Sequence, residues 1–162
     1  MKFRRNNIGL IALSLPAFLL FACSQETPDT KQDSNFVAVS SAAPKFDSTQ
    51  VQRGRQLYLK NCTVCHGING EGAPDWHQRN PDGTYPAPPL NGTGHAWHHP
   101  YSALVDTIKH GTIRLGGNMP PWKDRLSDQE INDIIIWFQS KWPKELYQAW
   151  QRMDRESRNG NP

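Results

Sequence analysis

One short stretch of this 162-residue chain holds two thiols and an imidazole at a spacing that can anchor an iron-containing ring. Cys62 and Cys65 are three residues apart, and His66 follows directly. Residues three apart lie on the same side of a helical turn, so both thiols can reach the two vinyl groups on one edge of a haem. The imidazole of His66 then lies under the iron and supplies its first axial ligand. The pattern therefore predicts one covalently attached haem c.

Two other uses of paired cysteines fit the sequence less well. A zinc site would need a second pair of cysteine or histidine ligands at metal spacing, and the sequence has only three cysteines. A thioredoxin-like redox pair belongs to a strand–helix–strand unit, which the sequence does not indicate. The third cysteine, Cys23, ends an N-terminal apolar run, so no pair remains for a disulfide.

The first 45 residues are predicted to serve export and tethering rather than folding. Residues 1–22 have the basic start and short apolar run of a signal peptide, too short to span a membrane comfortably. Leu20 to Cys23 resembles a bacterial lipoprotein signal, which predicts lipid on the Cys23 sulfur. The alternative is an ordinary secretory signal with an incidental cysteine. Ser24 favours outer-membrane delivery, and residues 23–45 are predicted as a flexible polar tether.

Composition and charge restrict the class of partner. Hydrophobic residues make up 36% of the chain, which is low, so a large apolar cofactor is expected to fill its centre. Three of the 18 basic residues lie in the predicted signal peptide, which leaves 15 basic and 15 acidic residues in the remainder. A nearly neutral chain argues against binding to nucleic acid.

Hydrophobic periodicity and capping residues predict helices separated by long loops. The expected helices cover residues 46–59, 100–110, 127–142 and 143–155, and residues 157–162 are expected to be disordered. Asp47 is a predicted N-cap, and Ser127 with Glu130 has the spacing of a capping box.

The first predicted helix carries a glycine where most residues would favour the helix more. Gly54 costs about 1 kcal/mol of helix propensity, so we expect another helix to pass close to it. A helix with Gly54 and Tyr58, followed by the cysteine–histidine motif, resembles the opening of class I cytochromes c. The resemblance covers residues 46–142. It implies an all-α fold of three to five helices around one haem. It also implies that the first helix crosses the helix of residues 127–142 nearly at right angles, in contact with Ile134 and Trp137.

The same resemblance assigns further residues to the haem. It implies that Pro88 offers its carbonyl oxygen to the His66 ring and that Leu90 packs against the haem. It also implies that Met119, followed by two prolines, is the sixth iron ligand. On the residues alone, the Pro88 segment could be a polyproline connector and Met119 a core filler. Met153 lies in a predicted polar tail and is a poor competitor.

The resemblance implies a periplasmic electron carrier rather than an enzyme, tethered to a bacterial membrane through Cys23. It would be a monomer or a subunit of a respiratory complex, with unknown redox protein partners. One alternative is a copper-handling or assembly protein whose histidines bind the metal. A haem sensor or peroxidase-like enzyme, with an open iron, is another. The residues that would bind copper are His95, His98 and His99. In a domain of this family, contact with the haem propionates or capping of a helix is the more common role for such histidines.

Overall fold

The computed structural model describes residues 44–160, which belong to one compact unit. The predicted signal peptide, Cys23 and nearly all of the predicted tether lie outside these residues, as do residues 161–162. No helix among residues 44–160 has the length and apolar character needed to cross a membrane.

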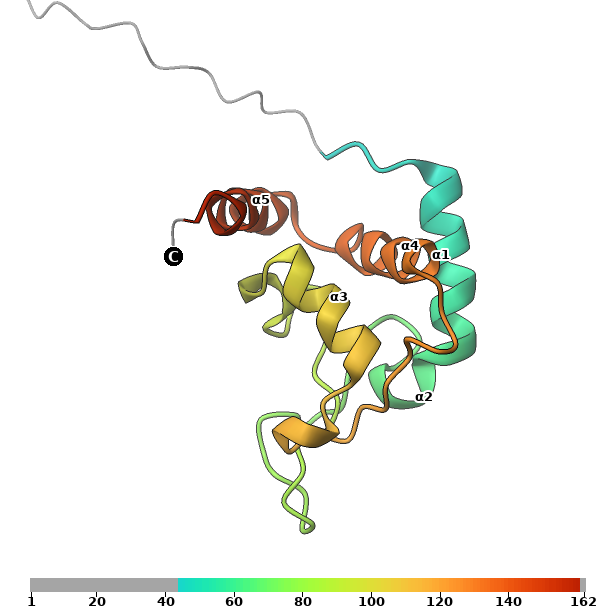
Figure 1. Cartoon of the computed structure of the whole chain (residues 1–162), viewed down its shortest axis with the longest axis vertical. Coiled ribbons are helices and arrows are strands. Elements are labelled where there is room, and N and C mark those ends of the chain that lie inside the picture. The colour runs from blue at the N-terminus through green and yellow to red at the C-terminus, as the bar shows by residue number, and fades with distance from the viewer. Residues whose placement is uncertain (1–43, 161–162) are drawn as a thin grey trace, which may run out of the picture. The chain divides into compact units, whose positions relative to one another are not determined.

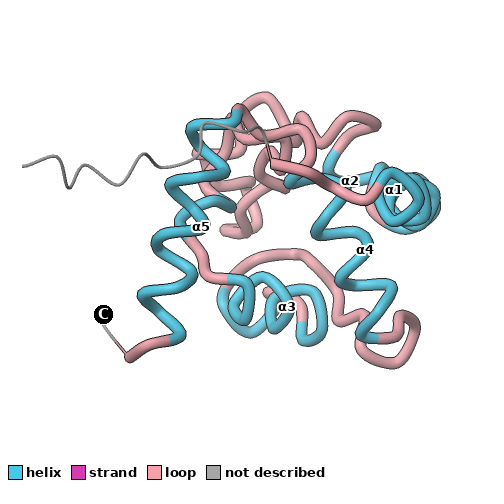
Figure 2. Tube along the Cα trace, turned by 90° about the horizontal axis from the view of Figure 1, so that it is seen from above, coloured by secondary structure: helices cyan, strands magenta, loops and turns pink. Residues whose placement is uncertain are grey.

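The described part of the chain is helical, with long irregular connections (Figures 1 and 2). A single parallel bridge between Tyr85 and Gly117 is its only β-pairing. The predicted all-α fold is therefore confirmed. The elements, in order, are α1 (Ser48–Asn61), α2 (Thr63–His66), the 3₁₀ turn η1 (Ala96–His98), α3 (Tyr101–His110), the 3₁₀ turn η2 (Ile113–Leu115), α4 (Asp128–Gln139) and α5 (Lys144–Arg158).

The predicted helix starts are confirmed by their caps. The Asp47 carboxylate accepts the Gln50 N–H at 2.6 Å, and Ser127 and Glu130 form the complete capping box. Such caps satisfy amide groups that have no partner within the helix. Pro100 is the N-cap of α3 rather than its first helical residue.

Three predicted helix ends were wrong. Helix α1 continues to Asn61, two residues further than predicted, and the Cys62 N–H still donates to the Tyr58 carbonyl at 2.8 Å. Helix α4 ends at Gln139, three residues early, because the chain turns so that the buried Trp142 indole N–H can donate to the Leu90 carbonyl at 2.8 Å. Helix α5 continues to Arg158, so residues 157 and 158 are helical rather than disordered. An Arg158–Asp154 ion pair of 3.0 Å, one turn apart, supports this last turn.

Helices α1 and α4 cross steeply at the glycine. Figure 2 views α1 almost down its axis and α4 from the side. A Cβ at Gly54 would overlap the Asp133 carbonyl oxygen and come within 2.9 Å of the Trp137 Cβ. The close approach was predicted for Ile134 and Trp137; Trp137 takes part in it, and the buried Ile134 lines a cavity. One turn from Gly54, the rings of Tyr58 and Trp137 lie 4.0 Å apart.

A buried carboxylate ties the same crossing together. Asp133 is 2% exposed and accepts hydrogen bonds from Gln50 and Arg53 of α1, each at 2.9 Å, and from Gln129 of its own helix at 2.8 Å. These donors offset the cost of burying the charge. Although burial alone would raise the pKa of Asp133, the three donors and the Arg53 charge leave it below its usual value.

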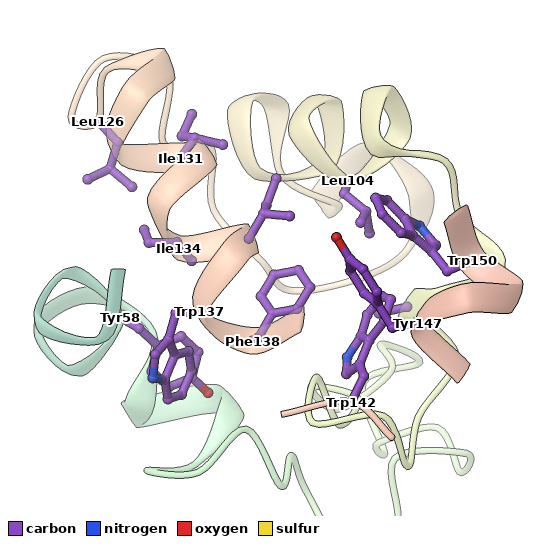
Figure 3. Close-up of a cluster of buried hydrophobic side chains, with 12 residues drawn as sticks. Tyr58, Leu104, Leu126, Ile131, Ile134, Trp137, Phe138, Trp142, Tyr147 and Trp150 are labelled. Carbon is purple, nitrogen blue, oxygen red and sulfur yellow. The ribbon is translucent and has the colours of Figure 1, made fainter. Parts of the chain in front are cut away.

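Helix α5 packs onto the domain through aromatic side chains. Trp142, Tyr147 and Trp150 form a contiguous cluster near Leu104 (Figure 3). The Trp150 indole N–H donates to the His99 carbonyl at 2.9 Å. Met153, expected in a polar tail, packs against this core. The C-terminal helix therefore supports the segment that leads into α3.

The crossing predicts the effect of a single methyl group. In Gly54→Ala the added Cβ must push α1 away from α4, so we expect the free energy of unfolding to fall by about 1–3 kcal/mol or more. Chemical denaturation of the purified protein measures this change. Gln56→Ala, on the exposed side of α1, is the matched control and should stay within about 0.5 kcal/mol of wild type. Equal stability of the two variants would contradict the close crossing.

Candidate haem-binding site

The predicted site residues meet at one cavity of about 640 Å³. Cys62, Cys65, His66, Pro88, Leu90 and Met119 all line it, although they come from sequence positions up to 57 residues apart. The remaining lining is mainly apolar and includes buried side chains of α3, of α4 and of the loop between them. The most deeply buried of these are Leu104, Leu126, Ile134 and Phe138.

The two thiols are positioned by the junction of two helices. Cys62 caps the end of α1, where its N–H donates to the Tyr58 carbonyl at 2.8 Å, and it also begins α2. Cys65 lies on α2 and is exposed, whereas Cys62 is half-buried. Burial, followed by the nearby Cys65, raises the pKa of the Cys62 thiol to about 12. Both sulfurs face one cavity, as attachment of a single ring requires.

The His66 imidazole is buried and held by a backbone oxygen. His66 is only 8% exposed, and its Nδ1 is 3.0 Å from the Pro88 carbonyl oxygen. Because a carbonyl can only accept, Nδ1 carries the proton and the Nε2 lone pair is available to a metal. Burial lowers the pKa of His66, although the bond to Pro88 opposes this shift. The ring is therefore kept neutral, which is the state that binds iron.

Glycines that the sequence analysis did not single out hold Pro88 in place. Gly70 accepts the Leu90 N–H at 2.7 Å, and Gly72 donates its N–H to the His66 carbonyl at 2.8 Å. A Cβ at Gly72 would lie 2.5 Å from the Pro89 nitrogen and 2.6 Å from the Pro88 carbonyl carbon. Gly72 also has a φ of +67°, which other residues rarely adopt. The run of glycines after His66 was the available signal in the sequence.

Met119 is held by the backbone of the loop that follows α3. Its carbonyl accepts the Thr112 N–H at 2.9 Å, and its own N–H donates to the Thr112 hydroxyl at 3.2 Å. Gly111, with a φ of +68°, lies against the Met119–Pro120 backbone, where a Cβ would overlap it. Thr112 and Gly111 therefore fix where the half-buried Met119 enters the cavity. The sequence analysis missed Thr112, since its role depends on a contact seven residues away.

The three histidines proposed for copper do not form one group. The rings of His95 and His99 lie 5.3 Å apart, but the His98 ring stacks on Trp97 at 3.6 Å and does not line the cavity. Among residues 44–160, no three His, Cys, Asp or Glu side chains are placed to hold a metal ion together. Instead, His77 joins His95 and His99 at the cavity, through Trp76, which stacks on both His77 and His95.

The cavity suits a haem in size, polarity and donor set. Its volume is within the range of about 300–1,000 Å³ that ligand and cofactor pockets occupy. Two thiols, an imidazole with a free Nε2 and a thioether all line an otherwise mainly apolar space. A planar apolar ring with a central metal is the cofactor that these residues fit.

Known proteins place the chain in the same class. Residues 49–138 match the family described as cytochrome c oxidase, cbb3-type, subunit III. A cbb3-type cytochrome c oxidase subunit FixP from Azorhizobium caulinodans is 29% identical over 120 residues, 74% of this chain and 36% of that protein. A cbb3-type subunit CcoP from Azospirillum is 32% identical over 91 residues, 56% of this chain and 28% of that protein.

Relatives with other names match the same region. A thiosulfate dehydrogenase from Psychrobacter arcticus is 35% identical over 119 residues, 71% of this chain and 32% of that protein. The chain thus spans about a third of the curated relatives it matches. No solved structure matches it significantly. The cysteine–histidine motif lies within the matched residues 49–138, and on this evidence the chain belongs to the cytochrome c family of cbb3-type oxidase subunit III.

Proposed function

We propose that this chain is a mono-haem c-type cytochrome that carries single electrons between respiratory redox proteins. The observation that carries the proposal is the hydrogen bond that fixes the His66 imidazole. The Pro88 carbonyl oxygen lies 3.0 Å from this imidazole, and two thiols and Met119 line the same cavity. These residues suit an iron with six permanent ligands. The sequence holds one such motif, so one haem is proposed.

The chain's residues have separate tasks in electron transfer. Haem, when bound, supplies the one-electron ferric/ferrous couple. Cys62 and Cys65 would hold the ring covalently, His66 and Met119 would ligate its iron, and Met119 would keep exogenous ligands from the iron. Buried Ile134 and Phe138 keep water from the cavity. Ligands that are held by backbone hydrogen bonds move little between oxidation states, which favours fast outer-sphere transfer.

Exposed apolar residues that are close in sequence to the cavity lining favour contact with a protein partner. Val64, between the two cysteines, is 91% exposed, and Leu115, which lines the cavity, is 82% exposed. Ile68 and Ile113 are also exposed. Several relatives are named as subunits of cbb3-type oxidases, so the proposed partner is a component of a respiratory complex. The chain itself is proposed to transfer electrons rather than to catalyse a reaction on a substrate.

The proposed location is the periplasm, with the domain tethered to a membrane by lipid on Cys23. Residues 1–22 are proposed to be removed as a signal peptide and residues 23–45 to act as the tether. Residues 46–142 would form the haem domain and residues 143–162 its C-terminal extension. Outer-membrane delivery rests on Ser24 alone.

Covalent attachment is the first test. The purified mature protein should carry one haem's added mass, keep its colour in acid-acetone, and titrate as a single-electron couple. Cys62→Ser together with Cys65→Ser should remove the added mass, whereas Val64→Ser, between them on α2, should retain it. A pigment that acid-acetone extracts from the wild type would contradict covalent attachment.

Ligation by Met119 is the second test. In Met119→Ala we expect loss of the weak near-infrared sulfur-to-iron band of the oxidised protein, a lower reduction potential and binding of carbon monoxide to the reduced protein. Met153→Ala, which removes a methionine from α5, is the control and should keep the band. Carbon monoxide binding to the wild type would instead favour the sensor or peroxidase-like alternative. A wild type without the band, whose spectrum changes only in a His95, His98 or His99 variant, would indicate bis-histidine iron.

Lipidation of Cys23 is the third test. Cys23→Ser should abolish acylation and leave the protein either soluble in the periplasm or as an uncleaved precursor. Mass spectrometry of the N-terminal peptide and membrane fractionation measure these outcomes, with Gln25→Ala as the control. Unchanged membrane attachment of a cleaved Cys23→Ser protein would contradict the lipid anchor.

A further inference from the structure

The segment that bonds to the His66 ring has few backbone donors of its own. Pro88, whose carbonyl oxygen lies 3.0 Å from the His66 Nδ1, and Pro89 after it have no backbone N–H. Leu90 is the next residue with an N–H, which donates to the Gly70 carbonyl at 2.7 Å. On its C-terminal side, the Pro88 carbonyl is therefore held through the backbone of Leu90.

A tryptophan at the junction of α4 and α5 holds the same backbone through its other polar group. The Trp142 indole N–H donates to the Leu90 carbonyl at 2.8 Å, so both the N–H and the carbonyl of Leu90 are hydrogen-bonded. Trp142 is 5% exposed and lies near Phe138 and Tyr147 (Figure 3). Because a buried indole N–H has little access to water, it favours one position of its acceptor.

A glycine allows this junction to pack directly on the segment after Pro88. Gly92 has a φ of +100°, which other residues rarely adopt. A Cβ at Gly92 would lie 3.2 Å from side-chain atoms of Pro143 and Leu146 and 3.3 Å from the Trp142 ring. The residues at the start of α5 therefore lie against the segment that carries the Pro88 carbonyl.

We propose that Trp142 is a positioning residue for the proposed iron ligand His66. It acts through the backbone of residues 88–90, which carries the acceptor of the Trp142 N–H and, two residues earlier, the carbonyl that faces the His66 Nδ1. The inference rests on the proposed haem site. The family model matches residues 49–138, so the proposed role belongs to a residue outside the matched part of the chain.

The direction of the effect on the iron follows from the His66 hydrogen bond. A carbonyl that accepts the Nδ1 proton makes the imidazole a stronger donor to a metal. Ferric iron carries one more positive charge than ferrous iron, so it gains more from a stronger donor. When the Pro88 carbonyl loses its fixed position, the bond weakens and the ferric state is stabilised less. Release of the segment therefore raises the reduction potential.

Trp142→Phe and Trp150→Phe are a matched pair of variants for the test. Both tryptophans are buried, and each indole N–H donates to a backbone carbonyl, at 2.8 Å for Trp142 and at 2.9 Å for Trp150. The Trp150 bond ends on His99, outside the segment that carries Pro88. Both substitutions keep an aromatic ring and should destabilise the protein to a similar extent. Only Trp142→Phe should change the environment of the iron.

Two measurements on the purified holoprotein separate these effects. Titration with a one-electron chemical reductant at constant pH measures the equilibrium constant for reduction, which should rise about two- to fivefold in Trp142→Phe. Direct partners of metal-bound histidines have effects of roughly 10–100-fold on metal sites, and Trp142 acts at one remove. Amide hydrogen exchange measures the segment itself, and the Leu90 N–H should exchange about tenfold faster in Trp142→Phe than in Trp150→Phe. Gly92→Ala, which crowds the same junction, should change both quantities in the same direction.

Each other outcome has a definite meaning. An unchanged or lower potential in Trp142→Phe would overturn the proposal, as would equal rises in the two tryptophan variants, because a general loss of stability affects both alike. Unchanged exchange of the Leu90 N–H would also overturn it. If Trp142→Phe does not fold with haem, Gly92→Ala replaces it in the comparison with Trp150→Phe. A wild type that lacks covalent haem would contradict the proposed function itself, whereas exchange of the Leu90 N–H still tests the position of the segment.

Discussion

The crossing of α1 and α4 at Gly54 is the constraint on which the rest of the structure depends. Because Gly54 has no Cβ, the two backbones approach closely enough for Asp133 to accept hydrogen bonds from Gln50 and Arg53 of the other helix. The same approach brings Tyr58 against Trp137, with ring centres 4.0 Å apart. Tyr58 in turn accepts the Cys62 N–H through its carbonyl and donates its hydroxyl to the Gly67 carbonyl at 2.8 Å. A packing contact between helices thereby sets the position of both ends of the cysteine–histidine motif.

Local chemistry made much of this predictable from the sequence. The cap at Asp47, the capping box at Ser127 and the glycine end of α3 each depend on residues a few positions apart, and each is present. The all-α class was implied by the resemblance to class I cytochromes c, and the helical periodicities agree with it. The ends of α4 and α5 did not follow, because they are decided at a distance. Helix α4 ends early because Trp142 bonds to Leu90, 52 residues away in the sequence. Helix α5 continues to residue 158 because it packs against the core.

In the candidate site, too, features set by neighbouring residues were predicted and features set by distant contacts were not. The cysteine spacing identified the attachment point, and a resemblance supplied Pro88 and Met119, which line the same cavity. Of the residues that hold them, Gly72 belongs to the run of glycines after His66, which was a signal in the sequence. Thr112 gave no signal by type, because it contacts a segment that the fold brings near. The copper alternative, which grouped His95, His98 and His99, is not supported by the described residues. The chain direction at η1 places the His98 ring on Trp97 and outside the cavity that His95 and His99 line.

Hydrogen bonds from irregular segments of the chain, rather than from helices, position both proposed iron ligands. The Pro88 carbonyl reaches His66 because the Gly70 carbonyl accepts the Leu90 N–H and Gly72 leaves room for the Pro88–Pro89 backbone. Thr112 forms hydrogen bonds with both the N–H and the carbonyl of Met119. Irregular loops are normally the mobile part of a domain. Here glycines allow close packing without side chains, so the loops are fixed by hydrogen bonds to one another. This gives a cavity that is lined both by helices α3 and α4 and by hydrogen-bonded loops, one of which carries Met119. A protein that exchanges electrons without changing shape needs that combination.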